Sequence, residues 1–223
     1  MASVSVAKAG GASAGALLFA CVAEQGSAAH PWFADESLTR GPESARNLAD
    51  AIHLLCALHG RHPGVVDHAA GRTVEPGARA WLQAAGDAMA SERQYLARLA
   101  VAAGPVPSTP GGAASETIVI AQRGALATLA QSDRHGCALG AALAFAVDWM
   151  PVRALLDSAA VRLGIASPPC RLGTDEELRA VADAAAENGS AERALLFGAQ
   201  QLALQHRGLW DLLEARRQAR FEG

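Results

Sequence analysis

Apolar residues in this chain recur at spacings of three and four between breaks of glycine and proline, and this pattern constrains the fold most strongly. The spacing puts apolar side chains on one face of an α-helix, whereas a half-buried strand needs alternation at every second residue. No segment alternates for long enough to indicate a strand, and the main β-branched run, Thr117 to Ile120, is short. The pattern therefore predicts an all-α protein.

Glycine, proline and capping residues divide the pattern into helices. Pro42 followed by an acidic residue and the capping box at Thr174 mark helix starts, and Gly60, Gly104 and Gly164 mark stops. The predicted helices cover about 13–25, 43–60, 75–103, 115–130, 133–163, 174–187 and 190–219.

Length and composition favour one domain. The chain has 223 residues, of which 51% are hydrophobic but only 4% aromatic, so alanine and leucine supply most of the core. We predict a single helical domain over 1–223, with an N-terminal helix at about 13–25, an irregular segment at 26–42 and a bundle at 43–220. The bundle is expected to be mostly antiparallel, with four long helices and two or three shorter ones.

Charge and cysteine usage limit the classes of partner. A net charge of −3 provides no basic face for nucleic acid, and the one basic cluster, Arg216 to Arg220, is expected to complement a helix dipole. No apolar run is expected to reach the roughly 18 residues of a membrane span. The four cysteines form no close pair, which suits a reducing cytoplasm in a bacterial protein. The stretch from Gly15 to Cys21, preceded by Lys8, resembles a lipoprotein signal only faintly, and its processing stays open.

A weak internal repeat relates the two longest predicted helices in the second half of the chain. Leu139-Gly-Ala141 aligns with Phe197-Gly-Ala199, and this alignment places Asp148 opposite His206. Pro151 lies near the middle of the first of these helices and should bend it. The repeat indicates that the long helices are equivalent members of one bundle.

The segment from His53 to His68 contains four of the seven histidines. Gly60 and Pro63 cut it into a helix and a turn, so a compact metal site from this segment alone is geometrically awkward. We expect His53 to face the bundle and His59, His62 and His68 to lie on a surface turn.

The sharpest candidate site uses residues far apart in the chain. The midpoints of the four long predicted helices hold His53, Glu92, Asp148 and His206, which are ligands suited to a single divalent metal ion. Neighbouring donors would be Tyr95, Gln201 and Gln205. A di-iron centre of the Glu-x-x-His type is disfavoured, because no glutamate is followed by histidine at that spacing. The alternative is structural: Glu92 pairs with Arg93 or Arg98 at the surface, and the other groups are satisfied internally.

Motifs for nucleophilic catalysis, phosphate loops and dinucleotide binding are absent, so catalytic and cofactor-binding residues stay unknown and enzymatic activity undecided. His30-Pro-Trp-Phe33 is interpreted as a plug at the end of the bundle or an anchor for a partner. Two functions remain. One is a soluble bundle that binds a metal ion or small molecule between its long helices. The other is a non-enzymatic interaction or regulatory module that self-associates, for example as a homodimer.

Overall fold

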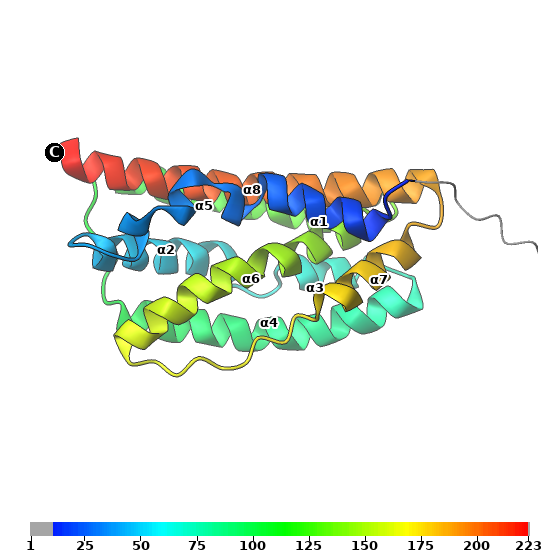
Figure 1. The fold of residues 1–223 in the computed structure, drawn as a ribbon, viewed down its shortest axis with the longest axis horizontal. Helices are drawn as coiled ribbons and strands as arrows, with labels where there is room; N and C mark the ends of the chain where they lie inside the picture. Colours follow the sequence, from blue (N-terminus) through cyan, green and yellow to red (C-terminus); the bar gives the residue numbers. More distant parts are fainter. Residues whose placement is uncertain (1–10, 223) are drawn as a thin grey trace, which may run out of the picture.

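The computed structural model describes residues 11–222, and within this range the chain forms helices and loops with no strand. The α-helices, coloured along the chain in Figure 1, are α1 (Ala14–Gln25), α2 (Ser44–His59), α3 (Val65–Ala70), α4 (Pro76–Ala102), α5 (Gly112–Ala130), α6 (Cys137–Leu163), α7 (Asp175–Ala185) and α8 (Gly189–Glu222). The all-α prediction is confirmed.

Local signals explain most of the helix boundaries. The side chain of Ser13 accepts a hydrogen bond from the backbone at the start of α1, and Thr174 does the same for α7. Pro76 occupies the first turn of α4, where its missing N–H costs nothing. The apolar periodicity did not predict α3, because a six-residue helix is too short for its apolar pattern to repeat. The segment predicted as irregular contains three short 3₁₀ helices: η1 (Ser27–Ala29), η2 (Pro31–Ala34) and η3 (Glu36–Leu38).

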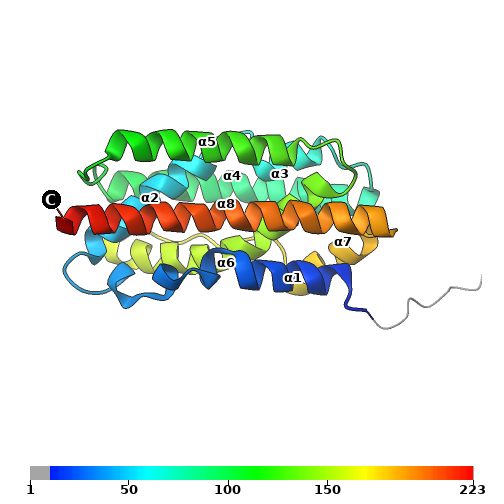
Figure 2. The same ribbon diagram turned by 90° about the horizontal axis from the view of Figure 1, so that it is seen from above.

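Figures 1 and 2 show an elongated bundle in which α8 runs along nearly the whole length. The consecutive helices α4, α5 and α6 alternate in direction, as short connections require. In contrast, α6 and α8 run in the same direction, because the loop after α6 and helix α7 carry the chain back to the end where α6 began. Helix α1 lies against α8 and α7, so the apolar stretch before Cys21 is part of the bundle.

Helix α6 is the central helix, and it corrects the expectation that no run is long and apolar enough to span a membrane. It has 27 residues, and its most apolar window has a mean hydropathy of 1.5. However, 78% of that window is buried by other parts of the fold, as expected for the core helix of a bundle. It is the single helix of this kind within residues 11–222.

The closest helix contact joins α6 to α8 through two glycines. A Cβ atom on Gly140 would lie 1.9 Å from the carbonyl oxygen of Leu195, and a Cβ on Gly198 would lie 2.0 Å from that of Cys137. Each glycine therefore touches the backbone three residues before the other one. This reciprocal contact corresponds to the internal repeat, which aligned Gly140 with Gly198.

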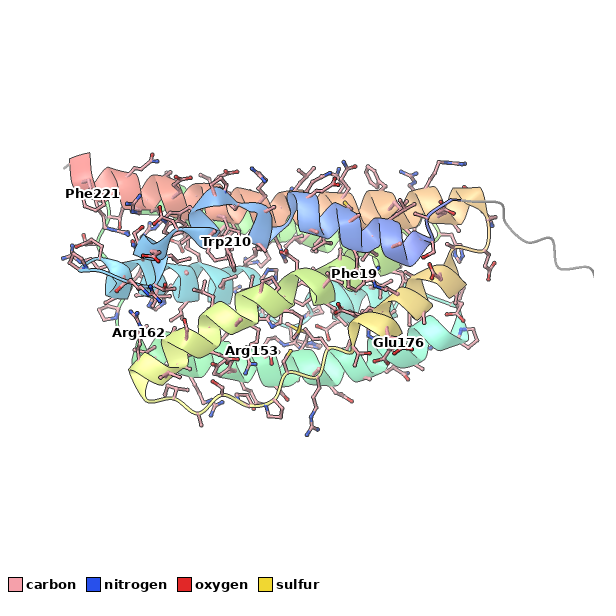
Figure 3. The ribbon with its side chains drawn as sticks, in the orientation of Figure 1. Phe19, Arg153, Arg162, Glu176, Trp210 and Phe221 are labelled. Carbon is pink, nitrogen blue, oxygen red and sulfur yellow. The ribbon has the colours of Figure 1, made fainter. Side chains whose placement is uncertain are left out.

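The aromatic segment after η1 packs inside the fold. Trp32 is 2% exposed, and the ring of Phe33 meets Trp210 of α8 edge to face at 4.7 Å between centroids. His30 lies 3.0 Å from a carboxylate oxygen of Asp211. These contacts support the plug interpretation and fasten the segment to α8, whose Trp210 is labelled in Figure 3.

We predict that Gly140→Ala destabilises the protein by about 2 kcal/mol or more, because the added methyl group must force α6 and α8 apart. The matched control is Gly124→Ala on the exposed side of α5, where a Cβ meets nothing within 4 Å. The control should gain about 0.5–1 kcal/mol from helix propensity. Urea denaturation measures both free energies, and equal stability of the two variants would contradict the close contact.

Candidate functional site

The structure brings two of the four predicted ligands together. The Nδ1 atom of His206 lies 2.6 Å from Oδ2 of Asp148, and both side chains are buried. Glu92 interacts with Trp149 and Arg153 instead, and His53 lies 2.8 Å from the carbonyl oxygen of Gly104. Within the described part of the chain, no group of three or more histidine, cysteine, aspartate or glutamate side chains is arranged to hold a metal ion.

Asp148 anchors the segment that follows α1. Its Oδ1 accepts the backbone N–H of Ser27 at 2.7 Å, and its Oδ2 accepts the Ser27 hydroxyl at 2.5 Å. A Cβ on Gly26 would lie 2.3 Å from Oδ1, so only glycine lets the chain approach so closely. The carboxylate of Asp148, near Pro151, is thus satisfied by hydrogen bonds, as the structural alternative proposed.

His59 is buried, which corrects its expected place on a surface turn. Its ring packs against Phe145, Trp149 and His206, at centroid distances of 5.1, 5.7 and 4.9 Å. Burial, reinforced by the neighbouring His206, holds the pKa of His59 well below its usual value. The Nε2 atoms of His59 and His206 are both buried without a hydrogen-bond partner among the described residues. As the last residue of α2, His59 still points inward.

Glu92 is also buried, so its expected surface pairing with Arg93 or Arg98 is wrong. The indole N–H of Trp149 donates to Oε2 of Glu92 at 2.9 Å, and Nε of Arg153 lies 3.2 Å from the same oxygen. Burial raises the pKa of Glu92, although both neighbours oppose this shift. Arg153, labelled in Figure 3, links α6 to α4 through this pair.

Tyr95, a candidate supporting donor, belongs to the Glu92 region rather than to Asp148 and His206. Its hydroxyl lies 2.8 Å from a carboxylate oxygen of Asp157 and 3.0 Å from the hydroxyl of Ser167. Burial raises the pKa of Tyr95 to about 12. Gln205, another candidate supporting donor, takes part through its backbone carbonyl, which accepts a hydrogen bond from the Gln122 side chain at 3.3 Å.

A cluster that the sequence analysis missed joins α2 to the end of α8. Nη2 of Arg216 donates to Oδ1 of Asp50 at 2.7 Å, and Arg220 donates to the other oxygen. Arg220 also donates to Oδ1 of Asn47 at 2.6 Å. Asp50 is 1% exposed and Arg216 4%, so these arginines do more than complement a helix dipole. Their spacing of four residues, which puts both on one helix face, was the available signal.

The buried cluster carries an excess of positive charge. Two guanidinium groups share the single carboxylate of Asp50, while Asn47, the Pro107 carbonyl and the Thr109 hydroxyl are neutral. Nε of Arg216 is buried with no partner among residues 11–222. Buried charges are normally balanced, so this surplus is the electrostatic feature that most needs explanation.

A groove of about 510 Å³ opens beside Arg216. It runs between α2, α5 and the linker that joins α4 to α5. We call it the arginine groove, and its lining residues are His53, Leu54, Ala57, Arg61, Val106, Pro107, Ser108, Thr109, Gly112, Ser115, Glu116, Val119, Ile120, Arg123 and Arg216. His53 is therefore a groove residue, held by its bond to the linker.

The first turn of α5 strengthens the positive potential in the arginine groove. Gly111 caps α5 with a left-handed φ of 75° and no side-chain hydrogen bond, and the first turn has no acidic residue. The N-terminal end of a helix carries a partial positive charge and unpaired N–H groups. Gly112 and Ser115 of this turn line the groove. Their own N–H groups donate to the carbonyl oxygens of Thr109 and Gly111, so the helix end acts through its partial positive charge, which favours the same sign of ligand charge as Arg216 does.

A profile described as a family of unknown function (DUF6975) matches residues 22–221. No curated protein and no solved structure matches the chain significantly. The matched range contains the arginine groove, the Asp50 cluster and the pair of Asp148 and His206.

We predict that acid weakens the fold through His59. Its pKa in the folded protein lies below the ordinary value of 6.5, so the unfolded chain takes up a proton that the folded chain excludes. This stability is fully present above pH 6.5 and is lost as the pH falls below that value. His59→Phe should reduce the slope of unfolding free energy against pH by up to about 1.4 kcal/mol per pH unit. The exposed His135→Phe control should leave the slope unchanged, and an unchanged slope in His59→Phe would exclude this role.

We also predict unequal costs for removing charges from the Asp50 cluster. Asp50→Asn leaves two buried guanidinium groups without an anion and should cost about 3–5 kcal/mol. Arg220→Gln leaves Asp50 paired one to one with Arg216 and should cost about 1–2 kcal/mol. Chemical denaturation compares the two, and a larger cost for Arg220→Gln would show that the cluster has no surplus charge.

Proposed function

This chain belongs to DUF6975, a family of unknown function, and we propose that it binds a small organic anion in the arginine groove. The observation that carries the proposal is the surplus charge beside the groove, where Arg216 and Arg220 share Asp50. An anionic group next to Arg216 would balance this charge in a place where water screens poorly.

The dimensions and walls of the groove suit a small molecule with an apolar body. Its volume of about 510 Å³ falls within the usual range for ligand sites, roughly 300–1,000 Å³. Leu54, Val119 and Ile120 supply apolar wall, and Val106 closes the side formed by the linker. Ile120 and Val106 are 51% and 55% exposed, so a ligand that covers them would remove apolar surface from water.

The charges of the residues that line the groove favour an anionic ligand. The groove is lined by the three arginines Arg61, Arg123 and Arg216, against one carboxylate, that of Glu116. Carboxylates and phosphates fit guanidinium groups through paired hydrogen bonds, so they are the favoured head groups. A cationic or neutral molecule of the same shape should bind more weakly.

The sequence suggested a protein that binds a small molecule or a metal ion between its long helices. We retain the small molecule, whereas the positions of the four candidate ligands do not support a metal ion. His53 lines the groove, Glu92 pairs with Arg153, and only Asp148 and His206 meet. The proposed ligand therefore lies between α2 and α5, where His53 contributes one wall.

We predict that octanoate and octyl phosphate bind more tightly than octanol or octylamine, by about tenfold or more in dissociation constant. Ile120→Asp puts a carboxylate on the apolar wall and should abolish binding of the two anions. Ile118→Asp is the matched control, because Ile118 is similarly exposed on α5 (45%) but does not line the groove. Isothermal titration calorimetry measures all affinities.

The variant Arg220→Gln provides a second test, because Arg220 pairs with Asp50 but does not line the groove. It removes the surplus charge without changing any groove residue, so it should weaken octanoate binding while octanol binding stays constant. Equal binding of anion, alcohol and amine, or equal effects of Ile118→Asp and Ile120→Asp, would overturn the proposed function.

A further inference from the structure

Arginine side chains lie at both ends of the arginine groove. Arg216 and the start of α5, which has no side-chain cap, lie at one end, where the linker passes. Arg61 and Arg123 lie at the other end, where they also line a small cavity next to His59. Arg123 is fixed there by a bond of 3.3 Å from its Nη1 to the carbonyl oxygen of Ala57.

The helical rise of α5 sets the distance between the two charged ends. Gly112 and Arg123 lie eleven residues apart on this helix, which corresponds to about 16 Å between their Cα levels. Because side chains lean toward the N-terminus of a helix, the guanidinium of Arg123 lies nearer, roughly 10–16 Å from the start of α5. Val119 and Ile120 occupy the stretch between these ends, so the charged ends are separated by apolar wall.

The cations at the Arg61 end are free to bind an anion. Within residues 11–222, the ion pairs of arginine include neither Arg61 nor Arg123, and the side-chain bond of Arg123 is to a neutral carbonyl. Glu116, the acidic residue of the lining, is only four residues along α5 from Gly112. It therefore lies nearer the start of α5 than Arg123 does, so its charge opposes the surplus at the Arg216 end and leaves the Arg61 end positive.

We propose that the ligand is an elongated dianion, with an oxyanion group at each end and an apolar middle. This inference rests on the proposed function and specifies its ligand class. One anionic group lies beside Arg216 and the start of α5, and the other between Arg61 and Arg123. The apolar middle covers Val119 and Ile120. Carboxylate and phosphate share the chemistry that guanidinium groups recognise, so either can supply the two ends.

The experiment compares two-headed with one-headed ligands of the same length by isothermal titration calorimetry. Linear dicarboxylates and bisphosphonates of roughly six to twelve carbons are matched with the corresponding monoacids, a range that brackets the span of the groove. The affinity of the two-headed series should peak at an intermediate length, about tenfold or more above the monoacid of that length. Comparing the two series decides between carboxylate and phosphate ends.

The variant Arg61→Gln/Arg123→Gln removes only the far-end charge. It should eliminate the advantage of the dianions over monoacids of the same length, while Arg216 keeps octanoate binding tighter than octanol binding. Arg72→Gln, at an exposed arginine that pairs with Asp133, is the control and should leave both series unchanged.

The outcomes separate this inference from the proposed function. If monoacids bind and dianions bind no better at any length, the two-ended ligand is wrong and the anion site stands. The same conclusion follows if the double variant retains the dianion advantage. If neither series binds, the proposed function fails and the ligand class fails with it.

Discussion

The close contact between α6 and α8 is the constraint on which the remaining interior depends. Gly140 and Gly198 each let the partner backbone approach to a distance that any Cβ would forbid. The two helices run in the same direction, so the contact continues two turns later, where Asp148 meets His206. Asp148 in turn binds Ser27, and this bond sets the position at which the segment after α1 crosses the bundle. Two glycines thus determine where a buried carboxylate can find its partners.

Three buried carboxylates join helices that are distant in sequence, and they differ in their partners. Glu92 of α4 shares Arg153 of α6 with Asp157, and Asp148 of α6 contacts His206 of α8. Asp50 of α2 instead faces two arginines of α8. Pairs of the first kind hold a register between helices, and a buried charge without a partner would weaken them strongly. The cluster with surplus positive charge is the one that borders an open groove, which is why charge and cavity together indicate an anionic ligand.

The sequence predicted the parts of this fold that depend on local pattern. Spacing and capping located the long helices, and the offset of the internal repeat aligned Asp148 with His206. The sequence pattern could not show whether His59 is buried, because a residue at the end of a helix faces inward or outward according to how neighbouring helices pack. Arg216 was assigned to the helix dipole for a related reason: the burial of a C-terminal arginine depends on α2, a helix more than 150 residues earlier. Residues that meet only through tertiary packing leave no periodic signal in one sequence.

The linker between α4 and α5 explains how an anion could reach Arg216 without breaking the buried cluster. His53 holds the linker through Gly104, and Arg216 reaches the Pro107 carbonyl and the Thr109 hydroxyl at 3.3 Å each. These two contacts are long for hydrogen bonds, whereas the bond from Arg216 to Asp50 is 2.7 Å. A charged acceptor competes better for a guanidinium N–H than a neutral carbonyl does. An entering anion would therefore displace the weak linker contacts first, and Asp50 would keep its arginines while the groove takes up the ligand.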